Sequence, residues 1–378
     1  MCKDEIIFIA PLPALSKRTR LAKMIPVIRA RGLSIRFFGW EREKGEMDRH
    51  AHSDPDVVEN RLMRGGGYAS GRARLLYLVW MIVVFWRVLT LGRGAVIFAL
   101  GWETAFPARL AAIFTGASIV FDDADRFSMI LRLPSPLHQV LQRAERWVSR
   151  VSVLHIVPGL SRYEWHHERM VVLRNTPLEA DFNQAKRSAR KRPDADLVLY
   201  ANGWIGETRG APVFLEALEK AEEADISVAM ILAGRVDGPS APRLVKHPLV
   251  TYVGEVAQTE ALSYYPAADA VLSFYDPDIP INRKAESNKW GDAVYFDCPI
   301  IVNSEVETAR DFVNNGAAWS VPYRDTSALV TLWRGLATAP EQVEVRRKAL
   351  QGFKESYPVF DLQFDKILST VLNKDHDS

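Results

Sequence analysis

The stretch KAESNKWGDAVYFDCPIIVNSEVET, residues Lys284–Thr308, predicts a loop, a helix, a tight turn and a buried strand in immediate succession. Ser287 or Asn288 can cap the helix, because each carries a short side-chain acceptor for the free N–H groups of the first turn. Pro299 cannot continue a helix, so the helix ends before it. The β-branched run 300–302 suits a buried parallel strand, which indicates an α/β fold.

Two charged side chains near the start of this helix indicate a ligand. Lys289 and Asp292 lie three positions apart, and therefore on one face close to the positive end of the helix. This arrangement suits an anionic ligand that carries hydroxyls, with phosphate on the lysine and the helix terminus and a ribose diol on the aspartate. Asn288 belongs to the same predicted site. The alternative is an ordinary amphipathic helix that leads into a core strand.

The stretch resembles the nucleotide-sugar site of GT-B glycosyltransferases, especially the bacterial surface-polysaccharide enzymes of glycosyltransferase family 4. Asp292 matches the usual acidic residue of the helix, and Asp297 stands where the family has a glycine before the proline. Lys284 stands where the family has an earlier glutamate. The resemblance therefore implies the nucleotide contact and leaves the contact to the donor sugar open.

Composition sets the class of protein. The 378 residues are too many for one typical core and suit two α/β domains. A net charge of +2 gives no argument for a polyanion, so we expect no nucleic-acid partner. Cys2 and Cys298 form neither a metal-binding nor a disulfide pattern. No signal peptide is recognisable, so we expect a reducing, cytoplasmic setting.

The first residues predict strand, helix and strand at 5–11, 19–31 and 33–38, which is the opening of a doubly wound domain. Ligands bind such sheets at the carboxyl ends of the strands. We therefore place Arg18 and Arg20 on the acceptor side, with a solvated basic helix start as the alternative. The polar segment 41–71 is expected to be a mobile loop on the same side.

The most apolar stretch is 75–91, LLYLVWMIVVFWRVLTL. It can be a buried helix of the first domain, a helix that also enters the interface of the inner membrane, or a transmembrane anchor. For the interfacial helix, Trp80 and Trp86 would contact lipid. The anionic headgroups would be met by arginines in and around the stretch, namely Arg72, Arg74, Arg87 and Arg93. The strand expected at 95–100 favours the first two interpretations.

Acidic residues follow the strand expected at 117–121. The short match of Asp125 to an aspartate in related inverting GT-B enzymes, such as the xanthan glucuronosyltransferase, makes it the candidate general base of an inverting transfer. The alternative is an acidic helix cap or a partner of Arg126, and the sequence does not decide between retaining and inverting transfer. Trp102 and Glu103, at the start of the preceding helix, are also placed on the acceptor side.

A glycine-containing loop follows the strand expected at 197–201, and such a loop can hold a diphosphate on its backbone N–H groups. It resembles the family-4 phosphate loop, in which Arg209 and Gly210 match the later basic pair. Trp204 replaces an earlier arginine, and we infer that Lys289 supplies the second charge. With the loops expected to pack the nucleobase and line the donor pocket, the predicted nucleotide-sugar contacts are Gly203, Arg209, Gly210, Gly254, Val256, Tyr275, Asn288, Lys289 and Asp292.

Together these features predict a GT-B fold of two Rossmann-like domains facing an interdomain cleft. We expect an acceptor domain at 1–180, a nucleotide-sugar domain at 190–355, and a helix at 356–378 that crosses back to the first domain. No cofactor and no metal is expected, because lysine, arginine and helix ends can stabilise the leaving diphosphate.

The resemblance implies a glycosyltransferase that uses a nucleoside-diphosphate-sugar donor. The acceptor would be a glycan or a polyprenyl-diphosphate-linked oligosaccharide in bacterial exopolysaccharide, capsule or O-antigen synthesis. The protein would be cytoplasmic, with a peripheral place on the inner membrane face as an option. The alternatives are an epimerase or hydrolase on the same fold, a non-catalytic scaffold of polysaccharide assembly, and a periplasmic-type binding protein.

Overall fold

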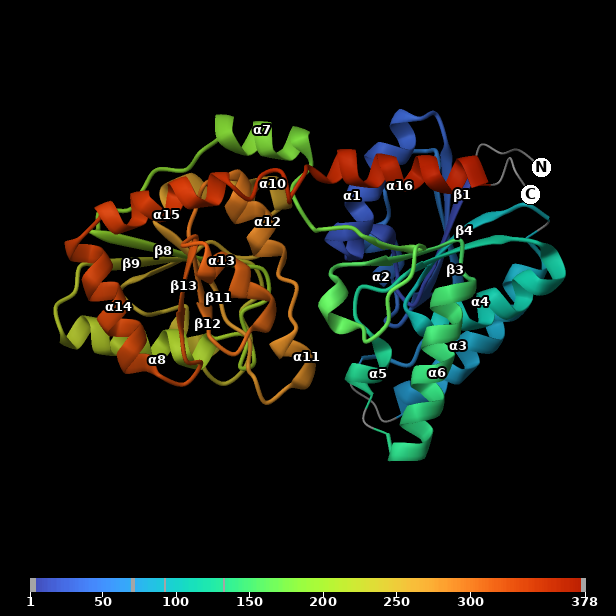
Figure 1. Cartoon of the computed structure of the whole chain (residues 1–378), viewed down its shortest axis with the longest axis horizontal. Coiled ribbons are helices and arrows are strands. Elements are labelled where there is room, and N and C mark those ends of the chain that lie inside the picture. Colours follow the sequence, from blue (N-terminus) through green and yellow to red (C-terminus); the bar gives the residue numbers. More distant parts are fainter. Residues whose placement is uncertain (1–4, 69–71, 92, 132, 375–378) are drawn as a thin grey trace. The chain divides into compact units, whose positions relative to one another are not determined.

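The computed structural model describes residues 5–68, 72–91, 93–131 and 133–374, and the side chains of 72–74 and 374 lie outside the description. Cys2 therefore falls outside it, as do the side chains of Arg72 and Arg74. The chain forms two compact α/β units (Figure 1). Unit 1 comprises 5–173 and 361–374, and unit 2 comprises 174–360, whereas the sequence placed the boundaries at 180–190 and 356.

In the part of the chain that the structure describes, unit 1 has a parallel sheet in the order β3-β2-β1-β4-β5-β6-β7. Its central strands, β1 and β4, are almost continuously apolar because helices cover both of their faces. The strands are β1 (Glu5–Ala10), β2 (Ser34–Glu41), β3 (Val57–Arg64), β4 (Val96–Leu100), β5 (Ser118–Asp122), β6 (Leu154–Val157) and β7 (Met170–Val172).

The helices of unit 1 include one from the end of the chain. Phe364 of the last helix contacts Phe98 of β4 at 6.0 Å between ring centroids, and Asp365 accepts from Nε of Arg31 at 2.7 Å. The predicted helix that returns to the first unit is therefore present. The helices are α1 (Thr19–Ala30), α2 (Glu46–His50), α3 (Arg72–Leu89), α4 (Trp102–Thr115), α5 (Phe127–Ile130), α6 (Ser135–Val151) and α16 (Phe360–Lys374), with 3-10 turns at Leu15–Lys17 and Leu160–Arg162.

The segment 41–71, expected to be a loop, contains α2 and the edge strand β3, so that expectation was wrong for its described residues up to 68. The carboxylate of Glu41 is fully buried and pairs with Arg61 at 2.5 Å and Arg64 at 3.1 Å. An edge strand exposes much of its length and tolerates such charges. For that reason VVENRLMR lacks the apolar pattern that identifies a strand.

Helix α3 has one buried and one exposed apolar face. Trp80, Val84 and Val88 are fully buried in the core, and Nε1 of Trp80 donates to Oγ1 of Thr104 at 3.1 Å. Helix α3 therefore packs in the core of unit 1, as the first two interpretations require, and Trp80 cannot contact lipid. The exposed apolar side chains follow helical spacing at Leu75, Leu78, Val79, Ile82 and Trp86. Among the described residues, no helix combines the length and the apolar character needed to cross a membrane.

Unit 2 has a parallel sheet in the order β10-β9-β8-β11-β12-β13 within the described residues. The predicted strand at 300–302 is β12, and it lies between β11 and β13, fully buried. The strands are β8 (Leu197–Asn202), β9 (Val228–Ala233), β10 (Val250–Tyr252), β11 (Ala270–Ser273), β12 (Ile300–Asn303) and β13 (Ala318–Val321).

The helices of unit 2 flank this sheet, as the ribbon shows (Figure 1). The two apolar clusters that they form with the sheet contain side chains from alternate positions of the strands, since these point to opposite faces. The helices are α7 (Glu179–Arg187), α8 (Ala211–Glu223), α9 (Ala241–Leu244), α10 (Gln258–Leu262), α11 (Pro280–Arg283), α12 (Asn288–Tyr295), α13 (Arg310–Asn314), α14 (Thr326–Thr338) and α15 (Glu341–Gln351), with 3-10 turns at Tyr265–Ala267 and Glu307–Ala309.

The ends of α12 explain the stretch with which the sequence analysis began. Ser287 caps the helix, and its Oγ accepts from the backbone N–H of Lys289 at 3.3 Å. After the helix, Asp297 has a φ of +49°, in the left-handed region that favours glycine. Its carboxylate pairs with Nζ of Lys354 at 2.9 Å. The turn therefore has the backbone conformation of a glycine although an aspartate occupies it.

Candidate functional site

A cationic cluster lies in unit 2 where loops follow β8 and β11. The guanidinium of Arg209 stacks over the ring of Tyr275, 4.6 Å from its centroid, and its Nη1 donates to Oδ1 of Asn282 at 2.6 Å. Asn282 is almost fully buried and donates in turn to the carbonyl of Asp276 at 2.9 Å. These contacts hold the arginine in one position, which reduces the entropy lost when it binds an anion.

Lys289 belongs to the same cluster, as the electrostatics of Tyr275 indicate. Burial alone would raise the pKa of the Tyr275 hydroxyl. The positive charges of Lys289 and Arg209, with hydrogen bonds from Ser287 and Ser273, outweigh burial and lower this pKa below its ordinary value. A positive potential strong enough to act on a phenol would also attract a phosphate group.

Glycines bring three loops of unit 2 close together. Gly203 follows β8 with a φ of +84°, and Gly210 caps α8 with a φ of +92°. A Cβ on Gly234, after β9, would lie 2.2 Å from the carbonyl oxygen of Gly203, so no other residue fits there. The N–H of Gly234 donates to the carbonyl of Gly254 at 2.7 Å. The loops after β8, β9 and β10 therefore meet backbone to backbone.

The helix residues divide between the surface and the core. Asn288 is exposed and Lys289 partly exposed at the start of α12. Asp292 is only 3% exposed. Burial, and then the charge of Asp292, raise the pKa of the hydroxyls of Tyr200 and Tyr265, so the carboxylate acts on the interior of the unit. Val256 is half-buried and packs against the apolar cluster that contains Tyr200 and Tyr265.

Unit 1 contains a cavity of about 1050 Å³ at the carboxyl ends of β1, β4 and β5, which we call the unit 1 cavity. Four residues predicted from the sequence line it together, namely Arg18, Trp102, Glu103 and Asp125. Most of the remaining wall is apolar and comes from α3, α5 and the start of α6. A large apolar cavity with a few converging polar groups is the usual form of a small-molecule site.

The two carboxyl groups of the unit 1 cavity differ in their surroundings. Asp125 is half exposed, and its oxygens lie 3.5 Å from Nη1 of Arg18 and 3.4 Å from Nη1 of Arg162. Glu103, in the first turn of α4, has no ion pair among the described residues. Burial, reinforced by the charge of Asp123, raises the pKa of the Glu103 carboxyl to about 7. A pKa of about 7 is the value expected of a group that exchanges protons near neutral pH.

Arg20 does not line the unit 1 cavity, contrary to the prediction of an acceptor-side position. It is 6% exposed, and its Nη2 lies 2.9 Å from Oδ1 of the buried Asp122. Burial raises the pKa of Asp122, and the charge of Arg20 opposes that rise. The arginine therefore compensates a buried carboxylate at the end of β5. Arg126, the partner considered in the alternative interpretation of the acidic residues, pairs with Glu145 and Glu164.

None of the known protein-family models and none of the curated proteins matches this sequence. Solved structures match nearly its whole length. Sucrose-phosphate synthase from Thermosynechococcus elongatus shares 14% of residues at a TM-score of 0.67, over 98% of this chain and 100% of that one. HepE of Anabaena, in complex with UDP and glucose, is 13% identical in sequence at a TM-score of 0.62. The match covers 97% of this chain and 99% of that one. A trehalose-6-phosphate structure from E. coli, bound with UDP-2-fluoro glucose, is 11% identical in sequence at a TM-score of 0.67. The match covers 97% of this chain and 99% of that one. The chain has the GT-B fold.

Sequence reasoning missed three residues that line the cavity of the first GT-B unit, namely Arg42, Tyr68 and Tyr77. Arg42 is 8% exposed, and its Nη2 donates to Oη of Tyr77 at 2.7 Å. Its guanidinium also lies 4.1 Å from the ring centroid of Trp40. Arg42 and Tyr68 fall in the segment expected to be a loop, where a single basic residue carries no recognisable signal.

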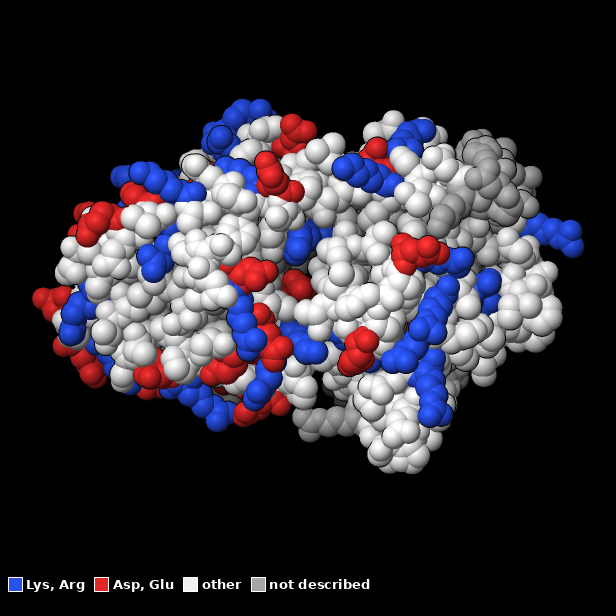
Figure 2. Space-filling model, viewed as in Figure 1, with Lys and Arg blue, Asp and Glu red and all other residues white. Residues whose placement is uncertain are grey.

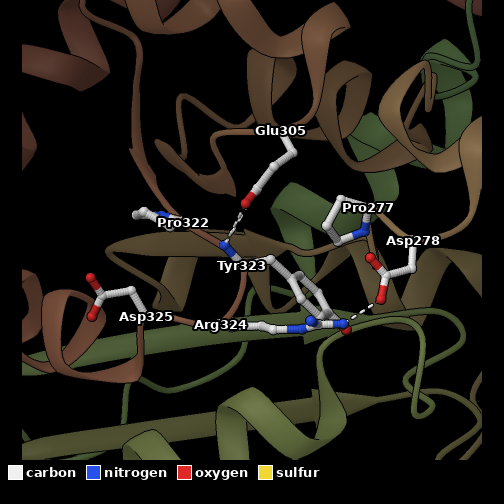
Figure 3. A pocket seen from close by; sticks show the side chains of 7 residues that line it. All are labelled: Pro277, Asp278, Glu305, Pro322, Tyr323, Arg324 and Asp325. Atoms are coloured by element: carbon white, nitrogen blue, oxygen red, sulfur yellow. Dashed lines mark hydrogen bonds and ion pairs between the residues drawn. The ribbon is translucent and has the colours of Figure 1, made fainter.

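A second, smaller cavity of about 410 Å³ lies in the second GT-B unit, beyond β12 and β13 (Figure 3). Glu305 points to the backbone N–H of Tyr323 and accepts from it at 3.1 Å, while Arg324 pairs with Asp278. The lining contains three carboxylates, those of Asp278, Glu305 and Asp325, and one cation, Arg324. This excess of negative charge makes the cavity poorly suited to a diphosphate. Neither Arg209 nor Lys289 lines it. Within the described ranges, no group of three or more His, Cys, Asp or Glu side chains could hold a metal ion.

Proposed function

We propose that this protein is a glycosyltransferase that uses a nucleoside-diphosphate-sugar as donor and is similar to the family 4 enzymes. One observation carries the proposal: the guanidinium of Arg209 stacks over Tyr275 beside the strand ends of unit 2, where the charge of Lys289 also lowers the pKa of the tyrosine. The overall fold adds support, since structures of this fold hold UDP with glucose and UDP-2-fluoro glucose.

The proposed role of this cationic cluster is to stabilise the leaving diphosphate. Negative charge develops on the diphosphate as the bond to the sugar breaks, and fixed cations lower the energy of that state most. Arg209 is held by Asn282, so it is positioned before the donor binds, and Lys289 extends from the capped first turn of α12. The loop glycines Gly203, Gly210 and Gly254, with Val256, Asn288 and Asp292, complete the proposed donor site.

For the acceptor we propose a lipid-linked oligosaccharide in the synthesis of a bacterial polysaccharide. Its support is the unit 1 cavity, which combines apolar walls with Arg18, Glu103 and Asp125. If the transfer inverts the anomeric centre, one of the two carboxyl groups takes the proton of the acceptor hydroxyl. Asp125 is the candidate from sequence, and Glu103 is the candidate favoured by its pKa of about 7.

A peripheral position on the inner membrane face follows from the same proposal. The exposed side of α3 carries apolar residues at helical spacing, including Leu75, Ile82 and Trp86. In Figure 2, basic side chains gather over the place of α6, where Arg143, Arg146 and Arg150 are exposed. Exposed apolar side chains and exposed arginines on helices of the same unit are features that can bind an anionic lipid surface.

The test of the proposed function is calorimetric titration with UDP, GDP, ADP, CMP and dTDP without added metal. We expect one diphosphate to bind at micromolar affinity and Lys289→Ala to weaken it about tenfold or more. Lys246→Ala, an exposed lysine of the same unit, is the matched control and should bind as the wild type does. If the wild type binds no nucleotide, the transferase proposal fails and a non-catalytic scaffold replaces it.

A further inference from the structure

An exposed tryptophan lies beside the cationic cluster of unit 2. Trp204 belongs to the loop that follows β8 and leads to Arg209, and it is 50% exposed. Its ring centroid lies 5.6 Å from Cζ of Arg209, whose guanidinium also stacks over Tyr275. The indole is therefore within reach of any group attached to an anion that Arg209 holds.

The indole of Trp204 is fixed at one edge. Its Nε1 donates to Oδ1 of Asp237 at 2.8 Å, and Oδ2 of Asp237 pairs with Nη2 of Arg235 at 2.7 Å. A Cβ on Gly206 would lie 2.9 Å from this Nε1, so the glycine leaves the space that the indole edge needs. Because the hydrogen bond uses only the edge, it orients the ring and leaves its faces to other contacts.

The backbone beneath Trp204 is also held. Ile205 and Val236 form a parallel bridge between the loops after β8 and β9. The N–H of Ile205 donates to the carbonyl of Arg235 at 2.8 Å, and the N–H of Asp237 donates to the carbonyl of Ile205 at 3.2 Å. An exposed ring on a fixed loop loses little entropy when a ligand stacks on it, so Trp204 is suited to binding.

The distance to Arg209 indicates which part of the proposed donor meets the ring. In a nucleoside-diphosphate-sugar, the sugar is bonded directly to the diphosphate, whereas a ribose separates the nucleobase from it. A ring 5.6 Å from the cation that holds the diphosphate is therefore placed for the sugar rather than for the base. The C–H bonds of a sugar ring carry partial positive charge, and the face of an indole attracts them.

We propose that Trp204 is the surface on which the sugar of the donor stacks, while Arg209 holds the diphosphate beside it. This inference deepens the proposed function and rests on it, because it requires a nucleoside-diphosphate-sugar as ligand. It supplies the contact to the donor sugar that the family resemblance leaves open, at a position where family 4 has an arginine. Trp204 then selects a sugar that has an apolar face of C–H bonds, whatever the nucleobase.

The test compares nucleoside diphosphates with the corresponding nucleotide-sugars by calorimetry on the full chain. The pairs are UDP and UDP-glucose, GDP and GDP-mannose, ADP and ADP-glucose, and dTDP and dTDP-glucose. In Trp204→Leu, the nucleotide-sugar that binds should lose about three- to tenfold in affinity, and its diphosphate should change less than about twofold. An equal loss for both ligands would mean that the ring serves the nucleotide or Arg209. No loss for either would mean that the donor does not reach the ring. Each of these two results overturns the proposal.

Trp204→Phe is the matched variant. Both substitutions remove the N–H that donates to Asp237, but only phenylalanine keeps an aromatic face. Trp204→Phe should therefore retain most of the wild-type affinity for the nucleotide-sugar. Equal losses in the two variants would assign the effect to the missing hydrogen bond, which contradicts stacking. Because the side chain is half exposed, both variants should fold, and thermal unfolding checks this.

Failure of the proposed function gives a different result from failure of this inference. A wild-type protein that binds none of the four pairs refutes the donor site, and the role of Trp204 with it. A wild-type protein that binds one pair, with a Trp204→Leu variant that binds the same nucleotide-sugar equally well, refutes the stacking on Trp204 alone.

Discussion

The two units have the same architecture and opposite chemistry at the ends of their strands. Both are parallel sheets between helices, and in both the candidate residues follow the carboxyl ends of central strands. In unit 1 these residues surround an apolar cavity with a buried arginine, and in unit 2 cations surround a tyrosine. The backbone therefore determines where a ligand can bind, and the loops determine which chemistry it must have.

The largest effect is expected on the free energy of unfolding of unit 1. Trp80 and Trp86 both lie on α3, one fully buried and one exposed. Trp80→Ala should lower the free energy of unfolding of unit 1 by about 3–5 kcal/mol, because it leaves a cavity and removes the hydrogen bond to Thr104. Trp86→Ala should change it by less than about 0.5 kcal/mol and should instead reduce binding to anionic vesicles.

Hydrogen exchange of peptides from each unit would measure the loss of stability, and sedimentation with vesicles would measure binding. If Trp86→Ala destabilises unit 1 as much as Trp80→Ala does, α3 has no exposed apolar face. The contrast between its two faces would then be wrong.

A second prediction compares the substitution of one arginine in each unit. Arg209→Ala should weaken the diphosphate identified by titration about 10- to 100-fold, because a hydrogen bond to a charged group contributes about 1.5–3 kcal/mol. Arg18→Ala, in unit 1, should leave nucleotide affinity unchanged. Calorimetry with the same nucleotide on both variants provides the comparison. If only Arg18→Ala loses nucleotide affinity, the donor binds in unit 1 and the proposed donor site in unit 2 is wrong.

A third prediction concerns pH and unit 1 alone. Burial raises the pKa of Glu103 from 4.5 to about 7, so folded protein keeps a proton that the unfolded chain has released. The resulting stability is complete below the ordinary pKa and is lost as the pH rises through 7. Glu103→Gln cannot ionise, so it should match the wild type near pH 4 and exceed it at pH 8.

The expected gain at pH 8 is on the order of 1 kcal/mol, since partial exposure screens the full effect. Urea unfolding at both values, with exchange read separately in each unit, is the measurement. A difference that does not depend on pH would show that Glu103 has an ordinary carboxyl pKa. It would also remove the argument that favours Glu103 over Asp125 as a base.

The smallest effect is expected at the turn of unit 2. Asp297→Gly removes the cost of the left-handed conformation but also the ion pair with Lys354. Because the conformation costs about 1–2 kcal/mol and a surface ion pair contributes about 0–1 kcal/mol, the variant should be equal to the wild type or more stable by up to about 1 kcal/mol. Asp297→Val should be less stable by a similar amount, which urea unfolding can measure. A stable valine variant would contradict the left-handed turn.

Much of the fold could be predicted because local patterns and tertiary structure agree. The cap at Ser287, the stop at Pro299 and the apolar strand β12 each follow from chemistry within a few residues, and the structure confirms them. Arg18, Trp102, Glu103 and Asp125, which the sequence predicted together, line one cavity because parallel strands place their ends along one edge of a sheet. That rule needs the order of the elements and no side-chain coordinates.

The errors occurred where the outcome depends on distant packing. β3 was missed because an edge strand needs no apolar face, and Arg42 because its burial is created by Trp40, Tyr68 and Tyr77. The sequence could not decide which face of α3 enters the core, which is why the interfacial interpretation placed Trp80 against lipid together with Trp86. The burial of Arg20, on α1, could not be predicted because its partner Asp122 lies far along the chain at the end of β5.

The position of α16 has a consequence for the order of events during synthesis. Unit 2 is one continuous segment that precedes α16, so all of its strands have left the ribosome before α16 does. Unit 1 is synthesised first. Its residues Phe98 and Arg31, however, can contact Phe364 and Asp365 only after more than 250 further residues have been made. Domains usually complete in the order in which they emerge. Here the nascent chain must keep the surface around Phe98 uncovered until α16 has emerged, so apolar surface of the first sheet stays exposed while all of unit 2 is synthesised.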